Sequence, residues 1–234
     1  MKKLTVEDLL YFQEEVIKWN TTFGNSVSDK SLINTYLNLS KEEFLGVNEY
    51  IDSYRKGDME GRLDGLVDSI FTGFMWMALG GESLLGTETW ITAIIADEGN
   101  STLVASSMDV TINEITESLE IEYLNGYKVH LIDLIIREQV NFDIRGAFDL
   151  VLQSNYSKAI HKKEYGNIDA ELVAIQRKGR YDDLFSEENG DFIILRAYKD
   201  LEEGTYFPKG KIVKSPTYFM SVEALGGLSE FVYG

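Results

Sequence analysis

The sequence of 234 residues contains no cysteine. Disulfide bonds, thiolate nucleophiles and zinc–thiolate sites are therefore excluded. Histidine is also scarce, since His130 and His161 are the only two, and their surroundings do not suggest a catalytic or metal-binding pair. The motifs GxSxG, GxxxxGK[ST] and HExxH are all missing. We therefore expect neither a side-chain nucleophile nor a phosphate-binding loop.

Long apolar runs are missing as well. The longest one, around Ile70 to Leu79, is too short to cross a bilayer. The chain starts with MKKLTVEDLLYF, in which Glu7 and Asp8 interrupt the apolar residues, and this is unlike a signal peptide. Together with the lack of cysteine, these features predict a soluble cytoplasmic protein that does not associate with a membrane.

Basic residues are few. The chain has 22 lysines and arginines against 39 aspartates and glutamates, which gives a formal net charge of −17 at pH 7. A long nucleic-acid backbone is bound by a basic surface that releases counterions, so a nucleic-acid polymer is not an expected partner. A small anionic substrate would be repelled too, unless a divalent metal ion and a few lysines acted on it locally.

Carboxylates, in contrast, are abundant on two consecutive predicted helical segments, Leu39 to Asp58 and Met59 to Gly81. The acidic residues that we single out from these segments are Glu42, Glu43, Glu49, Asp64 and Asp68. Within each segment their spacing returns them to roughly one side of a helix. Asp68 also adjoins the apolar run that begins at Ile70, so its ionised carboxylate must be paired or bound to a metal ion.

A helical hairpin with its break at Gly57-Asp58 would bring the two groups of acids together. For any single carboxylate, a solvated helix face is the more common explanation. As a set, converging carboxylates would repel one another and raise each other's pKa values unless a cation lay between them. Oxygen ligands select a hard divalent ion, and we expect Mg²⁺, with Mn²⁺ as the alternative.

Three other stretches follow the same order as in a known superfamily: WNTTFGN at 19–25, SNYSK at 154–158 and GKIVKSPTYF at 210–219. With the acidic helices, they resemble the all-α nucleoside triphosphate pyrophosphohydrolases, the superfamily of MazG, phosphoribosyl-ATP pyrophosphohydrolase and the dimeric dUTPases. The chain resembles in particular the phage-encoded members described as MazG-like. For a phage-encoded protein, the resemblance implies the host cytoplasm as the location.

The superfamily carries the pattern EExxE on its first acidic helix, and this chain departs from it. Glu42 and Glu43 match the first two acids. In one register the third acid falls on Gly46, whereas the spacing to the Gly57-Asp58 break puts Glu49 at the last acidic position. Both registers remain open at this point.

On the second acidic helix, the ExxD pattern of the superfamily becomes Gly65-Leu66-Val67-Asp68, and Asp64 stands one residue before the expected acid. Asp68 is the firmest match, and Asp64 is a candidate to replace the missing ligand from the preceding turn. The resemblance implies that a subset of the five acids binds the metal, namely Glu42, Glu43, Glu49, Asp64 and Asp68. It also implies Glu43 and Asp68 as the catalytic carboxylates.

The basic counterpart of these acids is sparse. Ser154, Asn155 and Lys158 of the SNYSK stretch are spaced to share one side of a helix. The resemblance implies that Asn155, Lys158 and Lys214 bind the substrate, with the lysines on phosphate. Without the resemblance, the simpler explanation of SNYSK is a polar helix face, and that of Lys214 is an exposed lysine at a strand end.

The apolar periodicity predicts a mainly α fold, an all-α pyrophosphatase-type helical bundle with a small C-terminal β-hairpin. Helices are expected at 6–19, 30–54, 59–79, 84–96, 109–121, 142–163 and 168–178, with a turn at Asn125-Gly126. A strand at 191–198 pairs with 181–185 through an Asn189-Gly190 turn, and 211–213 adds a short third strand. The expected domains are a helical one at 1–164, with a possible insertion at 82–141, and a small α+β extension at 165–234.

Three functions are compatible with these features. The first is a Mg²⁺-dependent nucleoside triphosphate pyrophosphohydrolase that cleaves between the α and β phosphates to give a nucleoside monophosphate and pyrophosphate. The second is a catalytically degenerate nucleotide-binding or interaction protein, suggested by Gly46 and Gly65. The third is a structural helical protein with solvated acidic faces. By analogy with the superfamily we expect a homodimer or a higher homo-oligomer, to which the apolar stretch FTGFMWMAL at 71–79 would offer surface.

Overall fold

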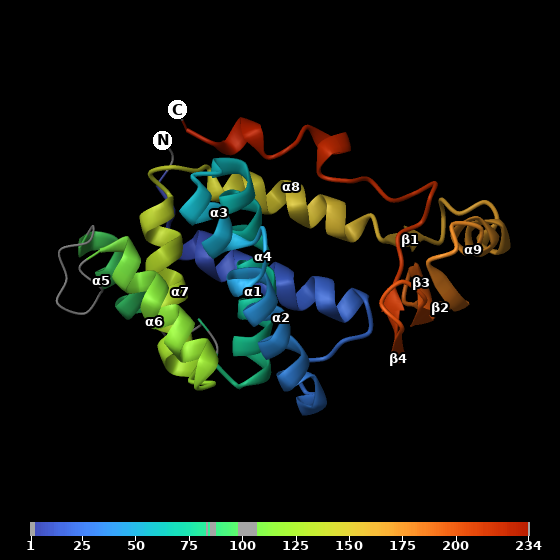
Figure 1. The fold of residues 1–234 in the computed structure, drawn as a ribbon, viewed down its shortest axis with the longest axis horizontal. Coiled ribbons are helices and arrows are strands. Elements are labelled where there is room, and N and C mark those ends of the chain that lie inside the picture. Colours follow the sequence, from blue (N-terminus) through green and yellow to red (C-terminus); the bar gives the residue numbers. More distant parts are fainter. Residues whose placement is uncertain (1–2, 83, 85–87, 98–106, 234) are drawn as a thin grey trace. The chain divides into compact units, whose positions relative to one another are not determined.

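The computed structural model describes residues 3–82, 84, 88–97 and 107–233. The mainly helical character predicted from the sequence is confirmed (Figure 1). The helices are α1 Val6–Thr22, α2 Ile33–Leu45, α3 Tyr50–Lys56, α4 Met59–Leu79, α5 Glu88–Asp97, α6 Met108–Glu120, α7 Leu124–Glu138, α8 Ile144–Tyr156 and α9 Ile168–Gln176. The strands are β1 Ala159–His161, β2 Tyr181–Asn189, β3 Phe192–Asp200 and β4 Thr205–Ile212, and the short 3-10 helices are η1 Lys30–Leu32, η2 Glu223–Leu225 and η3 Ser229–Phe231.

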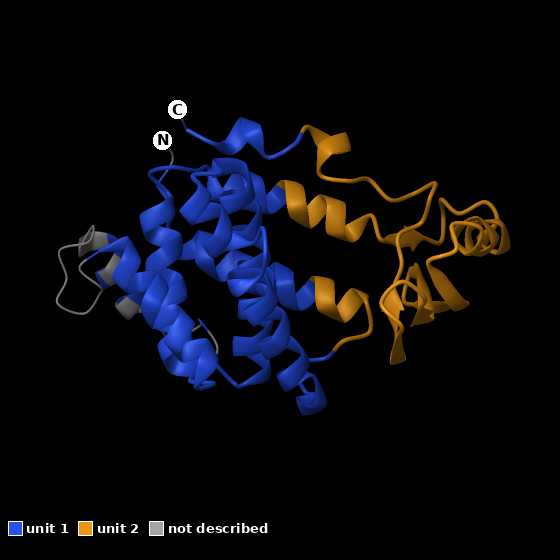
Figure 2. Cartoon of the chain, viewed as in Figure 1, with its two compact units in different colours: residues 1–18, 26–149, 227–234 blue, residues 19–25, 150–226 orange. Residues whose placement is uncertain are grey.

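The chain divides into two compact units (Figure 2). Unit 1 consists of residues 1–18, 26–149 and 227–234, and unit 2 of residues 19–25 and 150–226. The C-terminal residues return to unit 1, where the Asp143 amide donates to the Phe231 carbonyl over 2.8 Å and the Tyr233 amide donates to the Asn141 carbonyl over 2.8 Å. From the sequence we expected two domains, at 1–164 and 165–234. The two compact units are defined by contacts and do not test where independent domains begin and end, so this division stays a prediction.

Helix α4 lies at the centre of unit 1 (Figure 1) and packs against α2, α3 and α7. Most of its side chains are buried, including Leu66, Ile70 and Phe74. The helix is capped by Asp58, whose side chain accepts a hydrogen bond from the Gly61 amide over 3.1 Å, and it ends at Leu79 before Gly80 and Gly81, as the sequence predicts. The acidic residues that it carries are therefore fixed to a rigid, buried element.

The long helix predicted over 30–54 is wrong. The chain forms a 3-10 turn at Lys30–Leu32, then α2, and then leaves the helical conformation between Gly46 and Glu49 before α3 begins. Asn48 adopts a positive φ of 66°, a left-handed conformation that asparagine tolerates better than most residues. Gly46 closes α2 with a hydrogen bond from its amide to the Glu42 carbonyl. The apolar periodicity continues across this break, which is why the pattern alone did not reveal it.

The turn predicted at Asn125-Gly126 is also wrong, because both residues lie in the first turn of α7. The reversal occurs just before them, where Glu122 has a φ of 59°. Gly126 is needed for another reason: a Cβ there would come within 2.5 Å of the Tyr123 ring and 2.7 Å of the Ser118 hydroxyl. The glycine permits close packing of α7 on the end of α6, rather than a turn.

Unit 2 contains a four-stranded antiparallel sheet, more than the small hairpin that the sequence predicts. Strand β3 is central, with β2 along one edge and with β1 and β4 one after the other along its opposite edge. The predicted Asn189-Gly190 turn is confirmed, and Gly190 has a φ of 55°. Ile160, Ile193 and Leu195 of the sheet form part of the hydrophobic core of unit 2 together with Ile175 of α9.

Strand β1 arises from a segment that we expected to be helical. The helix predicted over 142–163 ends at Tyr156, and Ala159–His161 instead pair with Ile194–Phe192 of β3. Among the described residues, no helix is long and apolar enough to cross a membrane.

Candidate functional site

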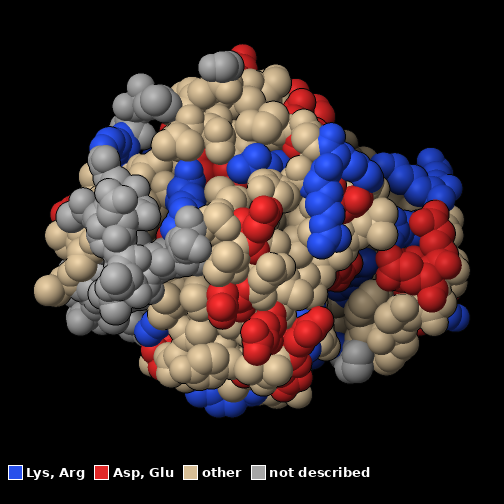
Figure 3. Space-filling model, turned by 60° about the vertical axis from the view of Figure 1, so that its left-hand side comes forward, with Lys and Arg blue, Asp and Glu red and all other residues tan. Residues whose placement is uncertain are grey.

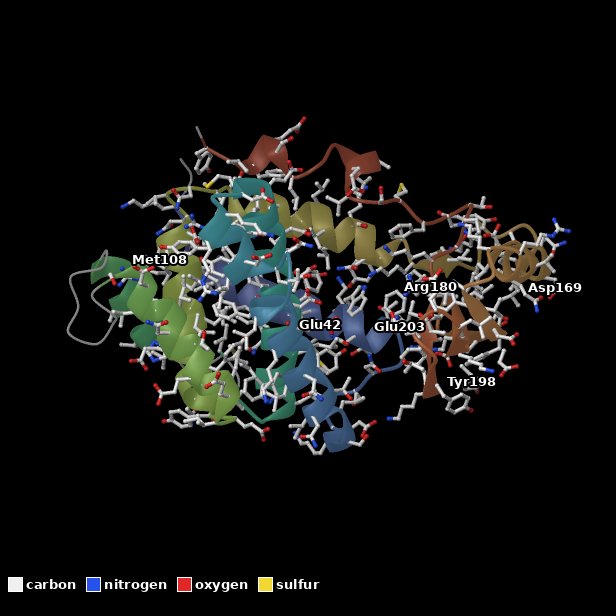
Figure 4. All side chains as sticks on the ribbon, viewed as in Figure 1. Glu42, Met108, Asp169, Arg180, Tyr198 and Glu203 are labelled. Carbon is white, nitrogen blue, oxygen red and sulfur yellow. The ribbon has the colours of Figure 1, made fainter. Side chains whose placement is uncertain are left out.

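The five acidic residues singled out from the sequence all lie in unit 1, on three elements. Glu42, labelled in Figure 4, and Glu43 belong to the last turn of α2. Glu49 is the residue that precedes α3, and Asp64 and Asp68 lie one turn apart on α4. We call these five residues the acidic cluster. They come from separate elements, so their grouping depends on how α2, α3 and α4 pack.

The turn between Gly46 and Glu49 separates the two positions that the sequence offers for the third acid. Because α2 ends at Leu45, Gly46 does not occupy a third acidic position on the same helix as Glu42 and Glu43. Glu49 is brought back towards them by the turn, and its carboxylate is hydrogen-bonded to that of Glu43.

Gly65 has a structural role that the sequence does not reveal. A Cβ built on Gly65 would lie 2.5 Å from the Tyr50 amide nitrogen and 2.8 Å from the Tyr50 Cα. These are backbone atoms, which cannot turn aside as a side chain can. The absent side chain lets the start of α3 approach α4 closely and sets Glu49 beside the helix that carries Asp64 and Asp68. An acid at position 65, as in the ExxD pattern, would not fit this packing.

The electrostatics of the cluster centre on Glu43. Burial and then the negative charges of Asp68, Glu49, Glu42 and Asp64 raise the pKa of Glu43 to about 8. The pKa of Glu49 is also raised, by burial and by Asp64 and Glu42, and the hydrogen bond with Glu43 acts in the opposite direction. Glu43 therefore lies within electrostatic range of the other four acids.

The cluster is partly open to solvent. Glu42 and Asp64 are exposed, whereas Glu43, Glu49 and Asp68 are half-buried. Acidic side chains gather in the lower centre of the face that Figure 3 shows. Within the described ranges, no group of three or more Asp, Glu or His side chains already has an arrangement that could hold a metal ion. Metal binding at the cluster would require rotamer changes, for which the two exposed acids have room.

A buried ion pair holds the start of α3 against α4 and α7. Glu138 at the end of α7 is fully buried and accepts hydrogen bonds from Arg62 of α4, at 2.7 Å from Nε and 2.5 Å from Nη2. The Tyr50 hydroxyl donates to the same carboxylate, as does the Asn141 side-chain amide over 3.0 Å. Burial and the charge of Glu138 raise the pKa of Tyr50, so its hydroxyl stays protonated. Tyr50 follows Glu49, and the network thus fixes one edge of the cluster.

Sequence reasoning missed Arg62 and Glu138. A signal for Arg62 was present, because it is the only basic residue in α4 and lies in a helix that is otherwise mostly apolar. Such a charge must find a partner when the helix is buried. Its partner is 76 residues away in the sequence, and no local pattern identifies Glu138.

The three residues expected to bind substrate lie in unit 2. Asn155 is in the last turn of α8, but Lys158 lies beyond the helix end, so the single helix face predicted for SNYSK is wrong. The two side chains still meet, since the Lys158 ammonium donates to the Asn155 side-chain oxygen over 2.5 Å. Lys158 and Lys214 line one pocket, of which Asn155 is not a lining residue.

The segment after Lys214 is anchored by a buried glutamate of α9. Glu171 accepts a hydrogen bond from the Ser215 hydroxyl over 2.6 Å and another from the Thr217 hydroxyl. Burial would raise the pKa of Glu171, but these hydrogen bonds hold it below its usual value. The Ser-Pro-Thr part of the GKIVKSPTYF stretch therefore has a structural role in positioning Lys214.

Comparisons with family models, with curated proteins and with solved structures each found no match to this chain. The resemblance to the pyrophosphohydrolase superfamily thus rests on the quoted motifs alone, and membership in that superfamily stays a prediction.

Proposed function

We propose that the protein is a Mg²⁺-dependent nucleoside triphosphate pyrophosphohydrolase, which releases pyrophosphate and leaves a nucleoside monophosphate. The observation that carries this proposal is the acidic cluster, in which burial and then the charges of four neighbouring carboxylates raise the pKa of Glu43 to about 8. The all-α pyrophosphatase-type bundle and the cytoplasmic location expected from the sequence belong to the same proposal.

The donor set of the cluster fits a hard divalent cation. It offers only carboxylate oxygens, which suit Mg²⁺ and Mn²⁺ better than softer metals. Glu43 is repelled by the negative charges of its four acidic neighbours, and a bound cation would relieve this repulsion. In the proposal, Glu43, Glu49 and Asp68 hold the metal from the half-buried side, and Glu42 and Asp64 complete the site by turning towards it.

The residues of the cluster would also contribute to the chemistry. When bound, the metal supplies charge compensation for the phosphates and lowers the pKa of a water ligand. Glu43, which the resemblance implies as a catalytic carboxylate, would accept a proton from the attacking water in its ionised form, and a nearby cation favours that form. Asp68 lies on the rigid helix α4 and would keep the geometry fixed during turnover.

An alternative function is a nucleotide-binding protein on the same scaffold that does not cleave its ligand. The observation in its favour is that no three acids in the described part of the chain are already arranged around a common point. The role of Gly65 in packing weakens the sequence argument for this alternative, since the glycine need not mark a lost ligand. This alternative predicts nucleotide binding that hardly depends on Mg²⁺.

A pyrophosphate-release assay on the purified protein distinguishes the two. Each canonical ribonucleoside and deoxyribonucleoside triphosphate is incubated with Mg²⁺, with Mn²⁺ or with a chelator. The proposal predicts release from one or a few nucleotides, and no release in the chelator. Nucleotide binding without release in any condition would support the alternative instead.

A further inference from the structure

Unit 2 contains a pocket of about 410 Å³ in which basic side chains are concentrated. Its lining includes five cationic residues: Lys158, Lys178, Arg180, Lys211 and Lys214. Among its lining residues in the described part of the chain there is no carboxylate. The volume lies in the range of sites that bind small molecules. Lys158 and Lys214 were expected from the sequence to contact phosphate, whereas the other three were not.

The pocket contrasts with the charge of the whole protein. Unit 1 has 11 lysines and arginines against 27 acidic residues, and unit 2 has 11 against 12. Almost all of the net charge of −17 therefore belongs to unit 1. Within a nearly neutral unit 2, five cations line one pocket. Carboxylates offset the charge of Arg180 and Lys211, and the remaining positive charge at the pocket favours an anionic ligand.

Two of the cations are held in position by acidic residues. Arg180 donates to the fully buried Asp200 from Nε over 3.1 Å and from Nη2 over 3.0 Å, and it also donates to Glu203 over 2.9 Å. Figure 4 shows Arg180 and Glu203 side by side. The Lys211 ammonium lies 3.7 Å from each of the same two carboxylates. These contacts fix Arg180 and Lys211 before any ligand binds, which lowers the entropic cost of binding.

Two other cations retain charge that is not paired in this way. Lys178 and Lys214 are exposed, and neither lies within ion-pair distance of an acidic residue in the ranges that the structure describes. Lys214 lies 4.5 Å from the centre of the Phe219 ring and influences Glu223 electrostatically at longer range. Their ammonium groups are available to a ligand phosphate.

The rest of the lining is apolar or aromatic. Trp19 and Tyr181 are half-buried lining residues, and Ile175 and Ile212 also line the pocket. The Lys158 ammonium lies 5.9 Å from the centre of the Trp19 ring, so a cation and a flat aromatic surface lie close together. A ligand that combines several phosphates with a planar ring matches both properties of the pocket.

We infer that this pocket binds the oligophosphate group and the base of a nucleotide without needing a divalent metal ion. The inference rests on the pocket alone and not on the proposed hydrolysis. A long single-stranded nucleic acid is disfavoured as the ligand, because the net charge of −17 would repel an extended backbone.

Calorimetric titration of the full chain in a chelator tests this inference, with ATP, inorganic tripolyphosphate and adenosine as probes. ATP and tripolyphosphate are expected to bind, and adenosine at least tenfold more weakly than ATP. The double variant Lys178→Glu/Lys214→Glu is expected to weaken ATP binding at least tenfold, since both side chains are exposed and their replacement should not disturb the fold. The matched control is Lys163→Glu/Lys199→Glu, which makes the same charge change at exposed positions of unit 2 outside the pocket lining.

Several outcomes would overturn the inference. Equal weakening by the control variant would show that only the overall field matters. Binding that requires Mg²⁺ and disappears in Asp68→Asn would assign the nucleotide to the acidic cluster. Tighter binding of a single-stranded oligonucleotide than of ATP, with a steep dependence on salt, would identify a polymer as the ligand. In contrast, nucleotide binding in the chelator without any pyrophosphate release would contradict the proposed function and leave this inference standing.

The aromatic part of the pocket is tested separately. Trp19→Leu and Tyr181→Leu should each weaken ATP more than tripolyphosphate, because only ATP has a ring to stack. An equal effect on both probes in both variants would contradict base recognition at this pocket.

Discussion

At the scale of single residues, Glu43 is the most informative side chain, because its environment opposes its charge. Burial and four neighbouring acids place its pKa at about 8, so it is mostly protonated at pH 7. In an unfolded chain the same group would ionise at the usual pKa of glutamate. Between these two pKa values the folded state binds more protons than the unfolded state, and stability therefore falls as the pH rises.

This difference predicts a pH dependence of stability that Glu43→Gln should reduce. Glutamine cannot ionise, so the variant does not incur the cost of a charge at position 43. We expect the free energy of unfolding of the original chain to fall between pH 5 and pH 9 by about 1–2 kcal/mol more than that of the variant, after allowance for solvent screening. Urea denaturation across this pH range measures it, and parallel profiles for the two proteins would contradict the environment described for Glu43.

Gly65 permits a second prediction at this scale. In Gly65→Ala the added Cβ would collide with the Tyr50 backbone at 2.5 Å, and this clash should outweigh the better helix propensity of alanine. We expect a loss of about 1–3 kcal/mol in the free energy of unfolding. Gly166→Ala serves as the control, since the nearest atom to its Cβ, the Tyr218 hydroxyl, lies 3.7 Å away. A Gly65 variant as stable as the control would show that the close approach of α3 is not required.

At the scale of elements, the position of α3 depends on a buried network that joins Tyr50, Arg62 and Glu138. Loss of Arg62 would leave the Glu138 carboxylate buried without its cation, which typically costs more than removing both charges. We therefore expect Arg62→Met to lower the free energy of unfolding by about 3–5 kcal/mol, and Arg62→Met/Glu138→Leu to be more stable than the single variant. Chemical denaturation of both variants measures the difference; a double variant that is less stable than the single one would contradict a network dominated by charge.

The elements that the sequence predicts well are those with local signals. Helices α1 and α4 follow from their periodicity and end signals, and the turn between β2 and β3 follows from Asn189-Gly190. The errors occur where a non-local contact decides the structure. The break after Gly46 depends on packing of α3 against Gly65, and β1 forms only because β3 offers an edge to pair with.

The same reasoning applies to the candidate site. The five acids could be chosen from the sequence, because carboxylates beside apolar runs are unusual. Their arrangement in space could not be predicted from the sequence, since it depends on Gly65 and on the pairing of Arg62 with Glu138. The cationic pocket of unit 2 was predicted only in part, because Lys178, Arg180 and Lys211 carry no local signal of a common location.

At the scale of the whole molecule, the apolar stretch FTGFMWMAL no longer supports association between chains. Phe71, Phe74, Met75 and Trp76 are buried within unit 1, so they do not form a free apolar surface. A homodimer therefore remains only an expectation from the resemblance. The strongest property at this scale is the uneven distribution of charge, with the excess of acids in unit 1.

A cation that binds only the folded state should stabilise this acidic unit. At a Mg²⁺ concentration of 100 times its dissociation constant, the expected gain is about 2.7 kcal/mol, or a rise of roughly 5–10 °C in the unfolding temperature. Thermal unfolding with Mg²⁺, and with NaCl at equal ionic strength, measures the specific part. An equal rise with NaCl would indicate general screening of unit 1 rather than a metal site.

The central claim is that the acidic cluster binds the metal ion that hydrolysis requires, and steady-state turnover of the preferred triphosphate by Asp68→Asn tests it most directly. The control is Glu117→Gln, which removes an acidic charge at an exposed position of α6 in the same unit. We predict that Asp68→Asn lowers Mg²⁺-dependent pyrophosphate release at least a hundredfold, while Glu117→Gln retains the original rate. Undiminished release by a folded Asp68→Asn variant would contradict the account.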